Sequence, residues 1–314
     1  MTRGNIHKHD DCNYLQSGRT MAGKRVLLAG AGDLCRRAAH LLLAQGDEVW
    51  GLRRHPPVHD TSGIRWLAGD LTQKLDLPLT GITHIIYAPT PTANHGTPTA
   101  GRHSAISSRP DEAAYRAVFL HGLQNLLGIL DRQTLQRFLF ISSSAVYGAQ
   151  GDVWVDETTP PNPSNFNGQV LLEAEQWLAA QLPNAICFRL AGLYGPGRLT
   201  LLERLKQGHA AVPRHSVHWA NRFHIDDAAR AAVHLLELKQ PEACYIGADN
   251  YPHRIDELYD ALAAMLNVDP PPAAPPSDKP GNKRLNNARL RTSGFEPAWP
   301  DAIEGYRALI DGAR

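Results

Sequence analysis

The chain lacks the features that mark several large classes of protein. Four of its 314 residues are cysteine, and no two of them form a Cys-x-x-Cys pair. The spacing excludes a disulfide scaffold and a zinc site, so we expect a reduced protein that holds no metal. No apolar stretch reaches the length of about 18 residues that a membrane span needs, and the first twenty residues are polar, unlike a signal peptide. We therefore expect a cytoplasmic protein with no membrane contact.

The chain also has little net charge. Its 32 lysines and arginines balance 31 aspartates and glutamates, which leaves a formal charge of +1. An electrostatic field this weak gives no reason to expect nucleic acid as a partner. We therefore expect a small-molecule substrate. A length of 314 residues allows one doubly wound sheet with a smaller lobe.

A strand, a glycine turn and a helix open the folded part of the chain. Residues 24–29 form a buried-strand run, residues 30–35 read Gly-Ala-Gly-Asp-Leu-Cys, and an apolar helix follows. The first glycine allows a tight turn, and the second lets backbone N–H groups at the helix N-terminus approach a pyrophosphate. Cys35 replaces the third glycine and is small enough to keep the helix close to the strand. The alternative is an ordinary strand-to-helix turn. The predicted cofactor contacts here are Gly30, Gly32, Asp33 and Leu34.

The end of the next strand indicates which dinucleotide binds. Residues 46–52 run into Arg53 and Arg54, about 20 residues after the glycines, where an NAD site carries an acid for the ribose 2′-hydroxyl. A guanidinium suits a 2′-phosphate, because it donates charge-assisted hydrogen bonds to it. The sequence therefore favours NADP(H) over NAD(H). The alternative is that both arginines belong to a solvated strand end.

Two further strands complete the predicted cofactor site. Residues 64–71 resemble a third strand whose end brings Asp70 and Leu71 beside the adenine pocket. Residues 84–89 form the fourth, which ends in Ala88 and Pro89. All four strands then point their carboxyl ends at one edge of a parallel sheet, where open α/β sheets bind ligands.

Three segments have no periodic pattern. Residues 1–22 are polar, and we expect a disordered tail; Met21, directly before the first strand, is an alternative start. Residues 91–110, rich in Thr, Ser, Pro and Gly, form a long loop that suits a lid over the cofactor. Residues 269–283 are rich in proline and are expected on the surface.

Motifs in the second half carry a resemblance to a known family. They are the strand and serine cluster of 138–148, the Asp-Glu-Thr-Thr-Pro of 156–160, the Phe-Arg-Leu-Ala-Gly-Leu-Tyr-Gly-Pro-Gly of 188–197, and the Arg-Phe-His-Ile-Asp-Asp-Ala of 222–228. With the glycine turn, they resemble an extended short-chain dehydrogenase of the NAD-dependent epimerase/dehydratase type over residues 24–310. The resemblance implies an α/β, Rossmann-type doubly wound parallel sheet with a smaller C-terminal substrate lobe.

The same resemblance predicts how the chain divides. The dinucleotide-binding domain would span 23–191, with 222–248 returning to it. The substrate lobe would consist of 192–221 and 249–314. In this family the helices expected at 111–130 and 168–180 commonly pair between subunits, so a homodimer is an open alternative.

The resemblance also implies the catalytic positions, and here the chain departs from the family. Ser143 matches the serine or threonine that polarises the reacting oxygen. The family's tyrosine falls on Asn167 and its lysine on Leu171; a register shifted by one gives Phe166 and Val170, which is no better. Asparagine does not exchange a proton near neutral pH and leucine carries no charge, so the usual proton relay is lost.

These losses resemble the atypical short-chain dehydrogenases of the YeeZ type. The family's asparagine in the preceding helix falls on Phe119, and Ala145 stands where a dehydratase carries an acid. That subgroup implies the fold and the cofactor class and leaves the reaction open.

Two functional hypotheses follow. The first is an NADP(H)-dependent oxidoreductase or epimerase acting on a nucleotide-linked or other small polar substrate. The second is a non-catalytic protein that binds or senses NADP(H). For the enzyme, the candidate substrate contacts are Ser144, Tyr194 and Arg222, and the candidate replacement proton donors are Tyr115, His121, Tyr194 and His224.

Overall fold

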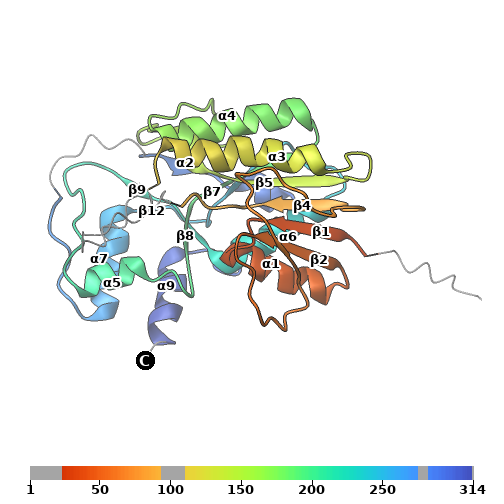
Figure 1. Ribbon diagram of the computed structural model, residues 1–314. Coiled ribbons are helices and arrows are strands. Elements are labelled where there is room, and N and C mark those ends of the chain that lie inside the picture. The colour runs from red at the N-terminus through yellow and green to blue at the C-terminus, as the bar shows by residue number, and fades with distance from the viewer. Residues whose placement is uncertain (1–22, 93–109, 275–281, 313–314) are drawn as a thin grey trace, which may run out of the picture.

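The computed structural model describes residues 23–92, 110–274 and 282–312, so the predicted tail and most of the predicted lid lie outside the described residues. Its centre is a seven-stranded, all-parallel sheet in the order β11-β7-β5-β4-β1-β2-β3 (Figure 1). This is a doubly wound order, whose connections reverse direction between β1 and β4. The strands are β1 (Arg25–Ala29), β2 (Glu48–Arg53), β3 (Arg65–Ala68), β4 (His84–Tyr87), β5 (Arg137–Ser143), β7 (Ile186–Leu190) and β11 (Cys244–Gly247).

Helices cover both faces of the sheet, which explains why its central strands are mostly apolar on both faces. One face carries α1 (Asp33–Ala44) and α6 (Ile225–Glu237), which pack on each other. The other carries α2 (Glu112–Arg116), α3 (Gly122–Ile129) and α4 (Phe166–Gln181) (Figure 1). Residues of β1 and β4 are almost fully buried between these layers. The predicted α/β fold is confirmed.

The helix predicted at 111–130 is interrupted. Between α2 and α3 the chain forms a π-turn, η1 (Ala117–His121). The Tyr87 hydroxyl donates to the Val118 carbonyl within this turn at 2.6 Å, and a Cβ at Gly122 would lie 2.4 Å from that hydroxyl. A buried phenol from β4 therefore occupies space beside the helix, and the π-turn accommodates it. The helical periodicity of the sequence does not predict this contact, because Tyr87 belongs to a strand that is distant in the sequence.

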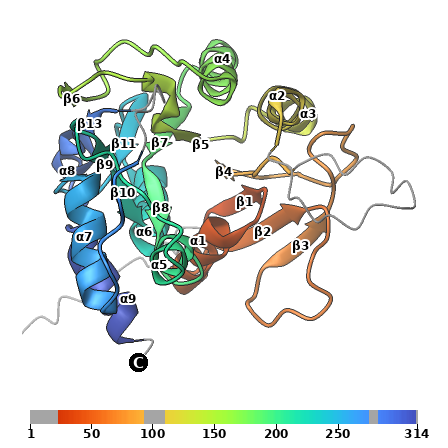
Figure 2. The same ribbon diagram turned by 90° about the vertical axis from the view of Figure 1, so that its left-hand side faces the viewer.

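A second, smaller hydrophobic cluster lies beside the sheet. Its helices are α5 (Thr200–Lys206), α7 (Ile255–Leu266) and α9 (Ala302–Asp311), which gather on the side of the molecule away from β3 (Figure 2). Short strand pairs accompany them: β8 (Gly192–Tyr194) with β10 (Arg222–His224), and β9 (Trp219–Ala220) with β12 (His253–Arg254). The other short elements are η2 (Ser144–Tyr147), β6 (Trp154–Val155), β13 (Arg284–Leu285) and α8 (Ala288–Thr292). The predicted domain boundaries remain a prediction.

A buried ion pair ties α4 to the sheet. Glu175 of α4 accepts hydrogen bonds from Arg189 of β7, the shortest from Nη2 at 2.6 Å, and from the Ser142 hydroxyl of β5 at 2.5 Å. All three residues are less than a tenth exposed. A buried charge is stable only when it is paired and hydrogen-bonded, so this set fixes the helix that carries Asn167 and Leu171 against the strand that carries Ser143.

We expect Arg189→Met to lower the free energy of unfolding by about 3–5 kcal/mol, because it leaves the Glu175 carboxylate buried without its partner. Urea denaturation of the two proteins measures the difference. Arg116→Met, which removes an exposed arginine paired with Glu112 and Glu173, is the control and should cost no more than about 1 kcal/mol. The double variant Glu175→Leu/Arg189→Met should regain most of the loss; a double variant as unstable as the single one would contradict this account.

Candidate functional site

The glycine turn after β1 packs directly on the end of β4. Gly30 has φ of +79°, and its N–H and that of Ala31 both donate to the Leu52 carbonyl of β2 at 3.0 Å. A Cβ at Gly30 would lie 2.4 Å from the Pro89 Cα. Both the backbone conformation and the space therefore require glycine here. The contact sets the distance between β1 and β4 where the sheet reverses direction.

Gly32 faces open space instead. It is the N-cap of α1, and it offers no side chain to the N–H groups of the first helical turn. An added Cβ would meet no other atom closer than the Gly30 carbonyl oxygen at 3.8 Å. The first-turn N–H groups and the positive end of the helix dipole thus remain available to an anion, which fits the pyrophosphate of a dinucleotide.

Two cavities adjoin at this turn. One, which we call the β2-side cavity, has a volume of about 480 Å³ and lies over the ends of β1, β2 and β3. The other, the β5-side cavity, has a volume of about 300 Å³ and lies toward β5 and α4. Gly32, Pro89 and Thr90 line both cavities, so the two form neighbouring halves of one cleft.

Every residue predicted to contact a cofactor lines one of these two cavities. Arg53, Arg54, Asp70 and Leu71 line the β2-side cavity with Gly30, and both arginines are exposed. Asp33, Leu34 and Ala88 line the β5-side cavity. Asp70 accepts hydrogen bonds from the backbone and side chain of Thr72, both at 2.9 Å, so the carboxylate is fixed at the cavity wall.

Some of the predicted catalytic and substrate-binding residues line a cavity, and others do not. Ser143 and Leu171 line the β5-side cavity, whereas Ser144, Asn167, Tyr194 and Arg222 line neither cavity. The Ser143 hydroxyl accepts from the Ala145 N–H at 3.2 Å, which leaves its own proton free to donate.

Tyr194 belongs to the smaller hydrophobic cluster, and Arg222 lies on β10, which pairs with the strand that carries Tyr194. Tyr194 is buried and stacks on Tyr306 at 4.4 Å between ring centroids. Its hydroxyl points at α9, where a Cβ on Gly305 would lie 2.0 Å from it. Nη1 of Arg222 donates weakly to the Asn221 carbonyl at 3.5 Å. Both side chains therefore contribute to packing in this structure, and their substrate role remains a prediction.

Among the candidate proton donors, Tyr115 is the one that lines the β5-side cavity with Ser143. His121 is exposed on the π-turn. His224 is buried, which lowers its pKa, and its Nδ1 accepts from the Asp226 N–H at 3.2 Å to cap α6. Burial raises the pKa of Tyr194 and leaves its hydroxyl without a hydrogen-bond partner in the described residues.

The wall of the β5-side cavity combines polar and apolar side chains. Phe119 and Leu171, which the sequence predicts to stand at the positions of the family's asparagine and lysine, both lie on it, as does Cys35. Burial raises the pKa of Cys35 to about 12, so its thiol stays protonated and packs as a small apolar group. Ser143 and Tyr115, which both carry a hydroxyl group, also line this wall.

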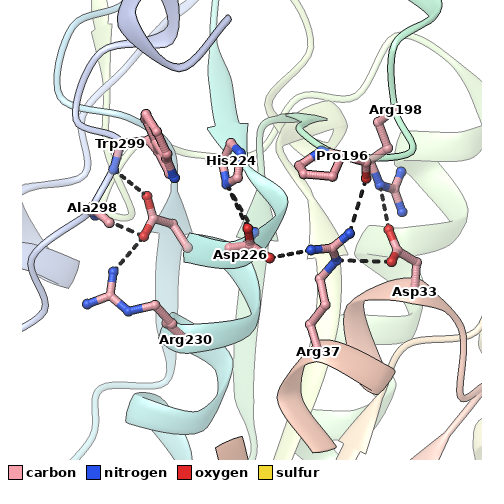
Figure 3. A network of polar contacts seen from close by, with 10 residues as sticks. Asp33, Arg37, Pro196, Arg198, His224, Asp226, Arg230, Ala298 and Trp299 are labelled. Carbon is pink, nitrogen blue, oxygen red and sulfur yellow. Dashed lines mark hydrogen bonds and ion pairs between the residues drawn. The ribbon is translucent and has the colours of Figure 1, made fainter. Parts of the chain in front are cut away.

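Sequence reasoning missed Arg198, which also lines the β5-side cavity. It follows the Gly195-Pro196-Gly197 segment directly, and its Nε donates to Asp33 Oδ2 at 3.2 Å (Figure 3). Arg37 of α1 binds the other oxygen of Asp33 at 3.0 Å and also pairs with Asp226 of α6. The one available signal was the position of this arginine directly after a recognised motif.

The fold and the cleft define a class: a doubly wound α/β protein with a glycine turn and an open helix N-terminus at the point where the sheet reverses direction. The sequence model of the NAD dependent epimerase/dehydratase family matches residues 26–247, and the chain belongs to that family.

Three relatives illustrate the similarity. Protein YeeZ of Escherichia coli K12 is 35% identical over 190 residues, which cover 59% of this chain and 66%, just under two thirds, of that protein. A solved structure from Methylobacillus flagellatus, described as a candidate NAD-dependent epimerase/dehydratase, has a TM-score of 0.75 and 33% identity, covering 93% of this chain and 99% of that one. The Bordetella bronchiseptica enzyme WbmG, solved with NAD, has a TM-score of 0.72 and 20% identity over 94% and 96%, which supports the fold alone.

None of the helices in the described ranges is both long and apolar enough to span a membrane. The same residues contain no group of three or more His, Cys, Asp or Glu side chains placed to hold a metal ion.

Gly30→Ala and Gly32→Ala should have different effects on the stability of the protein. We expect Gly30→Ala to destabilise the protein by about 2–4 kcal/mol, because it adds strain at positive φ and a clash with Pro89. Gly32→Ala should change stability by less than about 1 kcal/mol, since its φ of −87° suits alanine and its Cβ meets open space. Thermal and urea unfolding measure both. Equal losses would contradict the different surroundings of the two glycines.

Proposed function

We propose that the protein binds a nicotinamide dinucleotide along the glycine turn and is an NADP(H)-dependent oxidoreductase or epimerase that acts on a nucleotide-linked or other small polar substrate. The observation that carries the proposal is the pair of adjoining cavities at the turn, whose walls hold every predicted cofactor residue. The adenosine half would lie in the β2-side cavity and the nicotinamide half in the β5-side cavity. The family membership supports this direction.

The charge of the β2-side cavity supports the choice of NADP(H). Arg53 and Arg54 line it together with His55, and Arg53 also borders a neighbouring hollow that includes Arg36 and His40. Within the described residues, neither Arg53 nor Arg54 forms an ion pair with a carboxylate. A 2′-phosphate would thus find guanidinium groups that no protein anion already neutralises.

The residues of the β5-side cavity suit proton donation to a carbonyl oxygen. A bound reduced nicotinamide would supply hydride to the carbonyl carbon. The free proton of Ser143 would donate a hydrogen bond to the oxygen and polarise the carbonyl. Tyr115 would then give its phenolic proton to that oxygen and regain one from water. Burial raises the pKa of Tyr115, so the group remains protonated at neutral pH, as an acid in reduction requires.

The surroundings of Tyr115 hold its ring in place. The ring lies 5.5 Å from that of Phe119 and 5.4 Å, edge to face, from that of Phe166, measured between centroids. No hydrogen bond from its hydroxyl to another described residue is found, so the proton is free for a ligand in the cavity. Phe119 replaces the family's asparagine and thus serves here as packing for the proposed donor.

A second candidate function is binding or sensing of NADP(H) without turnover. The observation that favours it is the apolar side chain of Leu171 on the cavity wall, because leucine neither holds the nicotinamide ribose nor lowers a phenol pKa. The turnover experiment on Tyr115 distinguishes the two functions.

A calorimetric titration with NADPH and with NADH tests the cofactor. We expect tighter binding of NADPH, and we expect Arg53→Ala to weaken NADPH about tenfold or more while leaving NADH unchanged, because the 2′-phosphate is the group that differs. Arg307→Ala, which removes an exposed arginine on α9 paired with Glu304, is the control and should change neither affinity. If the unaltered protein binds neither dinucleotide, the proposed function is wrong.

Tyr115→Phe tests the proton donor. It should preserve the affinity for NADPH and lower the rate of NADPH oxidation, measured against a panel of small carbonyl compounds, by roughly 10²–10⁴-fold. Because burial raises the pKa of the phenol, the rate with the unaltered protein should not fall between about pH 6 and 9 through loss of this proton. Unchanged turnover in Tyr115→Phe would refute the assignment, and no turnover with any carbonyl compound would favour the non-catalytic function.

A further inference from the structure

Arg198 brings a positive charge to the cleft from a part of the chain far from the glycine turn. It follows Gly195 and Gly197, whose φ angles are +134° and +80°, and it lies two residues before α5 begins. Its N–H donates to the Gly195 carbonyl at 2.9 Å, which closes the turn. The side chain lines the β5-side cavity and contacts Asp33 in the first turn of α1.

One nitrogen of the Arg198 guanidinium is used by the protein. Nε donates to Asp33 Oδ2 at 3.2 Å, and no hydrogen bond from Nη1 or Nη2 to another described residue is found. The side chain is 37% exposed. A guanidinium presents its donors in a rigid planar fork, so the two terminal nitrogens remain for an acceptor in the cavity.

Asp33 holds this guanidinium and is itself held. Its Oδ1 accepts from Arg37 Nε at 3.0 Å, and Arg37 Nη2 donates to the Pro196 carbonyl at 3.1 Å (Figure 3). Arg37 therefore fixes both the carboxylate and the loop that carries Arg198. The guanidiniums of Arg37 and Arg198 balance the carboxylates of Asp33 and Asp226, so Asp33 leaves no net negative charge at this end of α1.

We infer that Arg198 binds the pyrophosphate of the dinucleotide and that Asp33 is the positioning residue that holds its guanidinium. The inference rests on the proposed function, because the pyrophosphate would reach Arg198 through the same open N-terminus of α1 that Gly32 exposes. Phosphate oxygens accept two hydrogen bonds from one guanidinium in a bidentate arrangement. The cleft would thus bind the pyrophosphate with backbone N–H groups on one side and with a side chain from the segment leading into α5 on the other.

Calorimetry of Arg198→Ala with three probes tests the inference: NADPH, NADH and adenosine 2′-monophosphate. We expect the Kd for both dinucleotides to rise by the same factor, roughly 10- to 100-fold, because both contain the pyrophosphate. The affinity for adenosine 2′-monophosphate should not change, since that probe lacks it. Arg53→Ala should give the opposite pattern, with NADPH and the monophosphate weakened and NADH spared.

Arg204→Ala is the matched control. Arg204 lies on α5, donates to the His209 carbonyl at 3.1 Å and lines neither cavity, so this variant should bind all three probes as the unaltered protein does. If Arg198→Ala binds both dinucleotides like this control, the inference is wrong while the proposed function stands. Loss of the monophosphate together with the dinucleotides would also refute it, because the pyrophosphate would not be the group that Arg198 contacts.

The positioning role of Asp33 needs a separate comparison. In an Asp33→Ala background the guanidinium is no longer held, so the further substitution Arg198→Ala should raise the Kd for NADH by a smaller factor than it does in the unaltered protein. Equal factors in the two backgrounds would refute that role. Unfolding curves of each variant establish that the comparison is made between folded proteins.

Discussion

The close approach of the Gly30 backbone to Pro89 is the constraint on which the rest of the cleft depends. At this point two neighbouring strands end and their chains leave in opposite directions, so a single side chain on Gly30 would push β1 and β4 apart. The approach places the N-terminus of α1 over the sheet edge and makes Pro89 a wall common to both cavities. Backbone groups would therefore make the main contacts with a ligand that spans the cleft, and side chains would adjust its affinity and specificity.

The sequence predicted most of what local patterns determine. The strand ends, the glycine turn and the cofactor-side residues follow from apolar runs and punctuating glycines, and the structure places them on one cleft. It did not predict the π-turn or the position of Arg198, because both depend on contacts between distant segments: Tyr87 with Val118, and Arg198 with Asp33. Contacts between distant segments produce neither a periodic hydrophobic pattern nor a bias in composition, so a single sequence does not reveal them.

The acidic motif after β10 shows how a family signature serves structure rather than chemistry. His224 caps α6, Asp226 pairs with Arg37 of α1, and the fully buried Asp227 accepts from the N–H groups of Ala298 and Trp299 at 2.9 and 2.8 Å (Figure 3). One turn of helix thereby joins the sheet layer to the C-terminal segment. His224 lines neither cavity, whereas Tyr115 lines the β5-side cavity, which is why Tyr115 is a stronger candidate donor than His224.

The proposed function combines retained binding groups with a predicted loss of the usual proton-transfer residues, and the physical reason lies in what binding and proton transfer each require. Binding of a pyrophosphate relies on backbone N–H groups and a helix terminus, which survive any substitution that preserves the turn. Proton transfer relies on particular side chains, which the sequence predicts to be replaced at Asn167, Leu171 and Phe119. Leu171 and Phe119 are buried, so apolar residues suit the core at those two positions. A chain can thus exchange its donor and keep its cofactor, provided another phenol reaches the same cavity. Tyr115 lines that cavity. It lies on α2, one helical turn before Phe119 of η1.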